Sequence, residues 1–132
     1  MTDPISILIV DDHEVVRNGL SAYIETLPEF RVIGEAVSGE EALIMVSEHI
    51  PDIVLLDLIL PGMDGVETTR HVKQISPRTQ VVVLTSFYED ANIFPALKAG
   101  AISYILKDMK MDRLAEVLRR AVQGEVTLHP RV

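Results

Sequence analysis

Five short apolar runs, rich in β-branched residues, alternate with helical periodicities along this chain of 132 residues. Runs of this kind are typical of strands that are buried on both faces of a parallel sheet. The order βαβαβαβαβα therefore predicts a doubly wound α/β sheet with right-handed crossovers, folded as one domain. The five runs are Ile5–Val10, Arg31–Glu35, Ile53–Leu56, Gln80–Leu84 and Ile102–Leu106.

The segments between these runs carry apolar residues at the spacing of helices. The clearest spacing runs from Val16 to Leu27 and from Leu114 to Val122. Three other segments are compatible with helices, namely Gly39–His49, Gly65–Ile75 and Asp90–Ala99.

Pro95 falls inside the fourth of these helical segments. Proline lacks an N–H and is tolerated in a helix only within the first turn. We therefore predict that the regular helix starts near Ile93 or Phe94, which leaves residues 87–92 as a mobile loop. Gly100 follows this helix, where a left-handed C-cap is often needed.

The charge of the chain is acidic, with 20 Asp and Glu against 12 Lys and Arg, for a formal net charge of −8. DNA and anionic membranes attract the opposite balance, so we expect these residues to bind neither. The absence of cysteine excludes disulfides, thiolate metal sites and cysteine nucleophiles, and is consistent with a cytoplasmic location. We expect neither a signal peptide nor a membrane span.

Polar residues follow four of the predicted strands at the point where each strand ends. Asp11 and Asp12 follow the first strand, Asp57 the third, Thr85 the fourth and Lys107 the fifth. Ligands of open parallel sheets bind outside the carboxyl ends of the strands, so we expect these groups to converge. Clustered carboxylates repel unless a cation or a lysine neutralises them, and all-oxygen ligation suits Mg²⁺. With Thr85 and Lys107 as a cradle, the implied chemistry is phosphoryl transfer onto the Asp57 carboxylate.

Each of these residues also has an ordinary structural explanation when it is taken alone. An Asp-Asp pair after a strand is often a helix N-cap, and Asp57 is compatible with a turn. Lys107 by itself is compatible with a solvated lysine. The functional interpretation depends on the conjunction, because every one of the polar groups falls at the carboxyl end of its own strand.

Four segments resemble the receiver domain of two-component response regulators, and together they cover nearly the whole chain. The resemblance implies a flavodoxin-like (βα)5 fold with a five-stranded parallel sheet in the order 2-1-3-4-5. The four segments are ILIVDDHE (7–14), DIVLLDLILPGMDG (52–65), VVVLTSF (81–87) and AGAISYILKD (99–108).

The resemblance assigns roles to the residues at the strand ends. It implies that Asp57 accepts phosphate from a sensor histidine kinase. Asp11, Asp12 and Asp57 would hold Mg²⁺ with help from the backbone carbonyl of Ile59. Lys107 would bind the phosphoryl oxygens or pair with Asp57.

The resemblance also implies a switch made of Thr85 and Tyr104. Thr85 would move toward the phosphoryl group, and Tyr104 would rotate inward with it. Without the family, we would interpret Tyr104 as a strand aromatic that is half-buried at the surface.

Three features resemble the NarL/FixJ type of receiver, which carries a LuxR-type helix-turn-helix domain after a linker. They are His13 after the Asp pair, Asp108 after the lysine, and the tail GEVTLHPRV (124–132). We therefore expect a receiver domain over 1–123 and, over 124–132, the start of a linker to a C-terminal DNA-binding domain that is not in these residues. The resemblance implies that the parent protein is a transcription factor, with DNA contacts only through that domain and a homodimer on phosphorylation. The dimer surface stays open between the fourth helix, fifth strand and fifth helix on one hand and the first and fifth helices on the other.

Two departures from the family concern the reaction and one peptide bond. Ile59, two residues after Asp57, and Phe87, two residues after Thr85, are both apolar. Both should impede an attacking water, so we predict slow autodephosphorylation. Asp108 stands where many receivers have a proline after a cis bond, and the isomer of the peptide before it stays open.

Three other functions compete with that of a phosphorylation-controlled receiver. A stand-alone phosphorelay carrier would have the same site but no output domain. A Mg²⁺-dependent aspartyl phosphohydrolase usually has a second acid two residues after its nucleophile, where this chain has Ile59. A flavin-binding flavodoxin needs a phosphate loop rich in glycine and hydroxyls after the first strand, where this chain has two anions. We expect a phosphoacceptor switch that catalyses its own phosphorylation and slow dephosphorylation, and no other enzyme activity.

Overall fold

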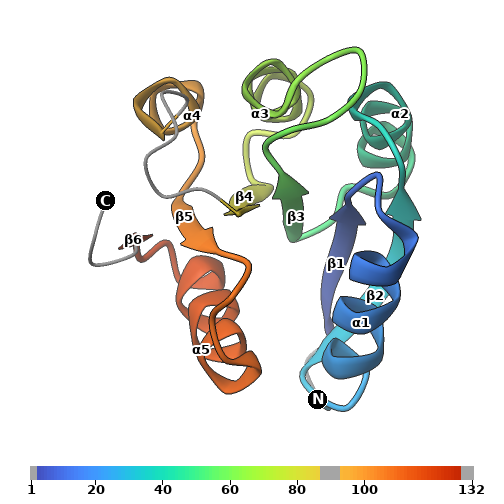
Figure 1. The fold of residues 1–132 in the computed structure, drawn as a ribbon, viewed down its shortest axis with the longest axis vertical. Helices are drawn as coiled ribbons and strands as arrows, with labels where there is room; N and C mark the ends of the chain where they lie inside the picture. The colour runs from blue at the N-terminus through green and yellow to red at the C-terminus, as the bar shows by residue number, and fades with distance from the viewer. Residues whose placement is uncertain (1–2, 87–92, 129–132) are drawn as a thin grey trace.

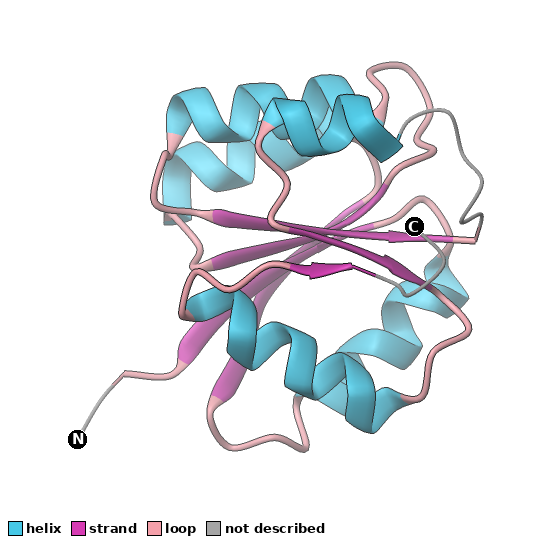
Figure 2. Ribbon diagram, turned by 90° about the vertical axis from the view of Figure 1, so that its left-hand side faces the viewer, coloured by secondary structure: helices cyan, strands magenta, loops and turns pink. Residues whose placement is uncertain are grey.

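A parallel sheet forms the middle layer of the protein, and helices cover both of its faces (Figures 1 and 2). The computed structural model describes residues 3–86 and 93–128. The strands are β1 (Ile5–Val10), β2 (Phe30–Ala36), β3 (Ile53–Asp57), β4 (Gln80–Thr85), β5 (Ser103–Leu106) and β6 (Thr127–Leu128). The helices are α1 (Glu14–Ile24), α2 (Gly39–His49), α3 (Gly65–Ile75), α4 (Ile93–Ala99) and α5 (Met111–Val122).

The strand order is β2-β1-β3-β4-β5-β6, and every neighbouring pair is parallel. The predicted doubly wound fold with the order 2-1-3-4-5 is thus confirmed. The expectation of five strands is wrong by one, because β6 pairs with the outer edge of β5. The chain turns at Gly124, whose φ is +81°, and this left-handed turn brings residues 127 and 128 back to the sheet.

Two hydrophobic layers hold the helices on the sheet, one on each face. Helices α2, α3 and α4 cover one face, and α1 and α5 cover the other (Figure 1). Because both faces are covered, the central strands are apolar at almost every position: β3 and the inner part of β4 are buried throughout. This burial leaves the strand ends as the place where polar side chains reach the surface.

The helix boundaries follow local capping signals. The Ser38 hydroxyl accepts a hydrogen bond from the Glu41 N–H at the start of α2, and the Asp64 carboxylate accepts one from the Glu67 N–H at the start of α3. Both helices span the residues expected for them. Helix α1 ends at Ile24, so the apolar spacing that extends to Leu27 continues beyond the helix.

Helix α4 is described over Ile93–Ala99, with Pro95 as its third described residue. The start of the helix near Ile93 stays a prediction, because the residues before Ile93 lie outside the described ranges. The expected loop over 87–92 lies outside the described residues. Gly100 ends the helix with a φ of +117°, and the Ala101 N–H donates to the Ala96 carbonyl across it. The left-handed C-cap expected at Gly100 is therefore confirmed.

All peptide bonds of the described residues are trans, including the bond between Lys107 and Asp108. No helix within the described ranges is both long enough and apolar enough to cross a bilayer.

Candidate functional site

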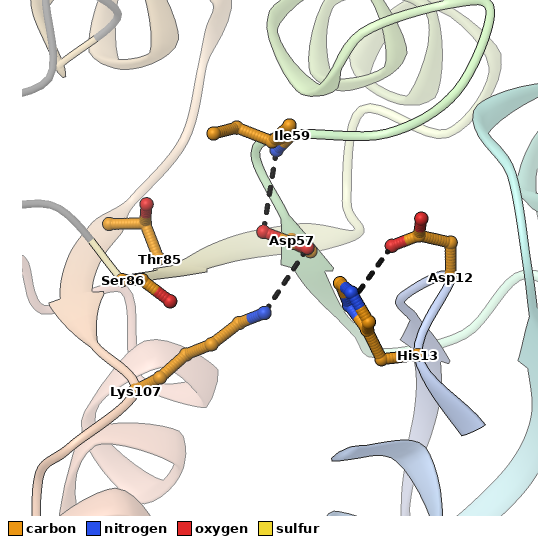
Figure 3. A pocket seen from close by; sticks show the side chains of 7 residues that line it. All are labelled: Asp12, His13, Asp57, Ile59, Thr85, Ser86 and Lys107. Carbon is orange, nitrogen blue, oxygen red and sulfur yellow. Dashed lines mark hydrogen bonds and ion pairs between the residues drawn. The ribbon is translucent and has the colours of Figure 1, made fainter. Parts of the chain in front are cut away.

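The carboxyl ends of β1, β3, β4 and β5 meet at a pocket of about 220 Å³ (Figure 3). These four strands are consecutive neighbours in the sheet, so residues far apart in the sequence face one another there. The pocket is lined by Asp12, His13, Asp57, Ile59, Thr85, Ser86 and Lys107. Asp11 adjoins it through its contact with Lys107.

The Lys107 ammonium joins two buried carboxylates at this pocket. Its Nζ lies 2.9 Å from Asp11 Oδ2 and 3.2 Å from Asp57 Oδ2. A backbone hydrogen bond from the Lys107 N–H to the Thr85 carbonyl, 2.7 Å long, holds this residue beside the end of β4. One positive charge is therefore shared between two negative ones, and it reduces their mutual repulsion.

Burial changes the proton affinity of both partners. Burial raises the pKa of Asp57; the Lys107 charge lowers it, and the Asp11 charge raises it further. Burial alone would lower the pKa of Lys107, but its hydrogen bonds to Asp11 and Asp57 and their charges outweigh burial, and the pKa is raised. The site therefore combines a firmly protonated lysine with an unusually basic carboxylate, and basicity favours nucleophilic attack.

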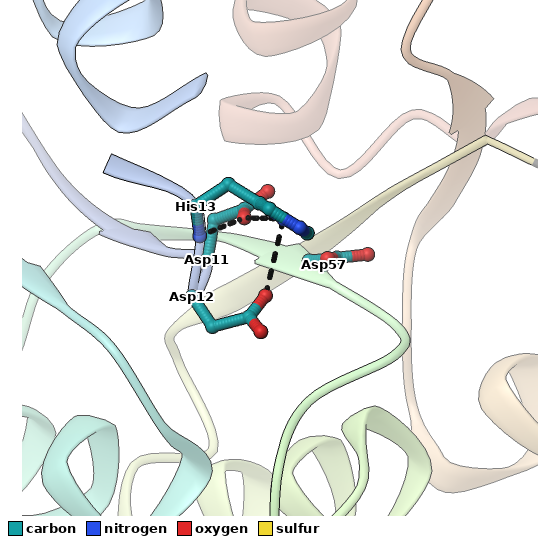
Figure 4. A group of neighbouring side chains, drawn as sticks. All are labelled: Asp11, Asp12, His13 and Asp57. Atoms are coloured by element: carbon teal, nitrogen blue, oxygen red, sulfur yellow. Dashed lines mark hydrogen bonds and ion pairs between the residues drawn. The ribbon is translucent and has the colours of Figure 1, made fainter. Parts of the chain in front are cut away.

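His13 lies against the two carboxylates that precede it (Figure 4). Its Nδ1 is 3.1 Å from Asp11 Oδ1 and 3.2 Å from Asp12 Oδ1. Its backbone N–H donates to Asp11 Oδ1 over 2.8 Å. In the sequence, His13 marks only the type of receiver, although its position directly after the Asp pair is a signal that it belongs to the site.

Arg17 is a second residue that the sequence analysis missed. Its guanidinium donates to the backbone carbonyl of Asp11 over 2.7 Å and to Glu35 Oε1 over 3.2 Å. Arg17 thus connects the first turn of α1 with the end of β1 and with β2. The sequence carries no signal for this contact, because it depends on how α1 packs beside β2.

The donor set of this cluster fits a divalent cation. Asp11, Asp12, His13 and Asp57 each offer one ligand atom, and these atoms all lie within 4.8 Å of one another. Carboxylate oxygens are the ligands that Mg²⁺ prefers. The Ile59 N–H donates to Asp57 Oδ1 over 3.3 Å, which places the backbone of residue 59 next to the same carboxylate.

The remaining predicted residues lie on β4 and β5. Thr85 is buried at the end of β4 and lines the pocket. Tyr104 is fully buried among the apolar residues beneath α2, α3 and α4, so the interpretation of it as half-buried is wrong. The residues around Tyr104 come from distant parts of the chain, so local sequence could not show its burial. Phe87 lies outside the described residues.

Comparison with known proteins identifies the family of this site. Residues 7–119 match the response regulator receiver domain. The chain belongs to this family. Since the match covers most of the chain, the doubly wound fold and the polar pocket described above are those of a receiver domain.

Two curated relatives narrow the type of receiver. The chain is 42% identical over 128 residues to the transcriptional regulatory protein LiaR of Bacillus subtilis, and 44% identical over 128 residues to the response regulator protein VraR of Staphylococcus aureus. Each match covers 97% of this chain and 61% of the relative. The chain therefore spans about three fifths of the length of these curated relatives.

Solved structures agree with this placement. A two-component response regulator of the LuxR family from an Aurantimonas species superposes with a TM-score of 0.91 at 34% identity, covering 97% of this chain and 91% of that one. The receiver domain of the response regulator NarL from Mycobacterium tuberculosis superposes with a TM-score of 0.89 at 29% identity, covering 94% of this chain and all of the other. This receiver is thus of the LuxR/NarL type, as predicted.

Proposed function

We propose that this receiver domain accepts a phosphoryl group on Asp57 from a phosphohistidine of a sensor histidine kinase, and that phosphorylation controls a transcription factor. The observation that carries the proposal is the Lys107 ammonium, shared between Asp57 and Asp11 beside an open pocket. A basic carboxylate beside a fixed cation is suited to attack an electron-poor phosphorus atom.

In the proposed reaction, an oxygen of Asp57 attacks the phosphorus atom of the donor. The P–N bond of the phosphohistidine breaks, and its electron pair stays on the donor imidazole, which takes up a proton. The product is an acyl phosphate on Asp57. Lys107, whose raised pKa keeps it protonated, neutralises charge on the phosphoryl oxygens, and the Thr85 hydroxyl donates a hydrogen bond to one of them.

Mg²⁺ is the proposed cofactor, held by Asp11, Asp12 and Asp57 with the backbone carbonyl of Ile59. When bound, the cation supplies further neutralisation of the phosphoryl charge. The four acidic and histidine side chains that approach within 4.8 Å support this assignment. Asp11 also keeps Lys107 in place, because its Oδ2 forms an ion pair with the Lys107 ammonium over 2.9 Å.

Thr85 and Tyr104 are the proposed switch. Thr85 lies next to Leu106 of β5 in the sheet register, two residues beyond Tyr104, so a shift of Thr85 acts directly on the strand that carries the tyrosine. The resulting change would bias the surface of α4, β5 and α5 and promote a homodimer. A surface of α1 and α5 is the alternative.

The relatives support a longer parent protein. The Bacillus subtilis relative is named a transcriptional regulatory protein. Its chain extends well beyond the segment that this chain matches. We infer a receiver over 1–123, a segment over 124–132 that adds β6 to the sheet and starts the linker, and a C-terminal helix-turn-helix domain that makes the DNA contacts, in a cytoplasmic protein. The competing function, a stand-alone phosphorelay carrier, predicts a reading frame that stops after Val132.

The test is incubation with Mg²⁺ and acetyl phosphate, followed by intact mass spectrometry. The native chain should gain one phosphoryl group, while Asp57→Asn, or the native chain with EDTA, should gain none. Size-exclusion chromatography of the same samples measures dimerisation. A native chain that stays unmodified, or an Asp57→Asn variant that is modified equally, would overturn the proposal.

A further inference from the structure

We propose that His13 is a ligand of the divalent cation in this pocket, and that it makes the pocket prefer a first-row transition-metal ion over Mg²⁺. This inference rests on the proposed function, because it concerns the same cation site. It adds a nitrogen donor to a site that the three aspartates otherwise make entirely from oxygen.

His13 Nδ1 lies at the spacing of a neighbouring ligand from an oxygen of each preceding aspartate. His13 Nδ1 lies 3.1 Å from Asp11 Oδ1 and 3.2 Å from Asp12 Oδ1 (Figure 4). Adjacent ligands of an octahedral ion with bonds of about 2.1 Å lie roughly 3 Å apart. An ion bound among these atoms could therefore leave the two separations from His13 Nδ1 nearly unchanged.

The backbone directs the imidazole toward the carboxylates. His13 is the N-cap residue of α1, yet its side chain makes no capping hydrogen bond to the helix. Its backbone N–H donates instead to Asp11 Oδ1, which anchors residue 13 to the carboxylate that its ring also contacts. The ring is thus held at the cluster by its own main chain and has no competing structural role in the helix cap.

Solvent reaches the ring from the other side. The His13 side chain is 66% exposed, whereas that of Asp11 is 3% exposed. Lys107 contacts Oδ2 of Asp11, whereas His13 contacts the other carboxylate oxygen, Oδ1. The ammonium and the imidazole therefore approach Asp11 from different oxygens, and a cation at the histidine side does not require Lys107 to leave Asp11.

Coordination chemistry gives the expected preference. Imidazole binds first-row transition-metal ions far better than it binds Mg²⁺, whose preferred ligands are carboxylates, carbonyls and water. Coordination through Nδ1 requires the neutral tautomer whose proton is on Nε2. His13 would thus raise the affinity for Co²⁺ most, raise that for Mn²⁺ less, and leave that for Mg²⁺ almost unchanged.

The first measurement is calorimetric titration of the unphosphorylated chain with Mn²⁺, Co²⁺ and Mg²⁺. In His13→Gln, the affinity for Co²⁺ should fall about tenfold, that for Mn²⁺ should fall less, and that for Mg²⁺ should change by less than about twofold. His71→Gln is the matched control, because His71 is also surface-exposed but pairs with Glu67 on α3, and it should change none of the affinities. Thermal unfolding followed by circular dichroism should show that both variants remain folded.

The second measurement detects the ligand directly. Electron spin-echo envelope modulation of bound Mn²⁺ should show coupling to an imidazole ¹⁴N in the native chain and in His71→Gln, and no such coupling in His13→Gln. A native spectrum without imidazole coupling, or an equal change in all three affinities in His13→Gln, overturns the inference and leaves the aspartate site intact. If the native chain binds no divalent cation, or if Asp12→Asn and Asp57→Asn bind as well as the native chain, the proposed cation site itself is wrong.

Discussion

The ammonium of Lys107 lies 3.2 Å from Oδ2 of Asp57. Lys107 follows β5 and Asp57 ends β3, and β4 lies between these two strands in the sheet. The contact spans the width of one strand because both side chains project past the carboxyl edge of the sheet. Asp57 therefore depends on a residue fifty positions away for its charge balance, and substitutions at this contact should change stability as well as function.

Asp57→Asn should raise the free energy of unfolding by about 1 kcal/mol at pH 7 in EDTA, because the neutral amide avoids the cost of a buried carboxylate beside Asp11. Burial raises the pKa of Asp57 above its ordinary value of 3.8, so the native state holds this proton more tightly than the unfolded state does. The stability that the protonated group contributes is present below pH 3.8 and is lost as the pH rises through the folded-state pKa. Urea unfolding at pH 3 and pH 7 measures the effect, which should be present only at the higher pH.

The control for this prediction is Asp108→Asn, because Asp108 is an exposed carboxylate next to Lys107. It should leave the stability unchanged at both pH values. An Asp57→Asn variant that is no more stable than the native chain at pH 7 would show that Lys107 already compensates fully for the buried charge.

Ile59→Asn should accelerate loss of phosphate from phosphorylated Asp57 by several fold. Ile59 lines the pocket with a side chain that is 54% exposed, so it covers the approach to Asp57 with apolar atoms. An amide at this position could hold a water molecule for attack on the phosphorus atom. The decay of the phosphorylated species, followed by intact mass, measures the rate. Ile59→Leu should decay at the native rate, and an unchanged half-life in Ile59→Asn would contradict the prediction of slow autodephosphorylation.

Ser103→Ala and Thr127→Val should each raise the free energy of unfolding by about 1 kcal/mol. The two hydroxyls lie on paired residues of β5 and β6, and within the described part of the chain neither has a hydrogen-bond partner although both are buried. Removing an unsatisfied hydroxyl removes its desolvation penalty. Thr69→Val is the comparison, because the Thr69 hydroxyl donates to the Gly65 carbonyl over 2.8 Å. Removing this hydroxyl should not raise the free energy of unfolding measured by chemical denaturation.

Arg17→Met should lower the free energy of unfolding by about 2 kcal/mol and weaken Mg²⁺ binding several fold. The substitution removes the donor to the Asp11 carbonyl and leaves Glu35 without its ion pair, so the end of β1 is held less firmly. Calorimetric titration and urea unfolding measure the two effects. Arg78→Met removes an exposed pair with Asp52 and should cost less than about 0.5 kcal/mol, with cation affinity unchanged.

Local patterns predicted most of the fold. Each of the five apolar runs became a strand to within one residue at either end, because a strand that is buried on both faces needs continuous apolar residues. Gly100 predicted the end of α4, since its φ of +117° is a conformation that favours glycine. By contrast, β6 has no apolar run of its own and forms only because the edge of β5 is available to pair with it.

The amino-acid sequence by itself determined the alternation of strands and helices, the helix caps and the polar residues at the end of each strand, because these features depend on neighbours within a few positions. Only the tertiary structure decided that Tyr104 is fully buried, that His13 Nδ1 lies between two carboxylates, and that Arg17 holds the carbonyl of Asp11. These relationships depend on how separate elements pack and on which way each side chain points. A local pattern carries no information about either, since both follow from the competition of all elements for the same core and the same edge of the sheet.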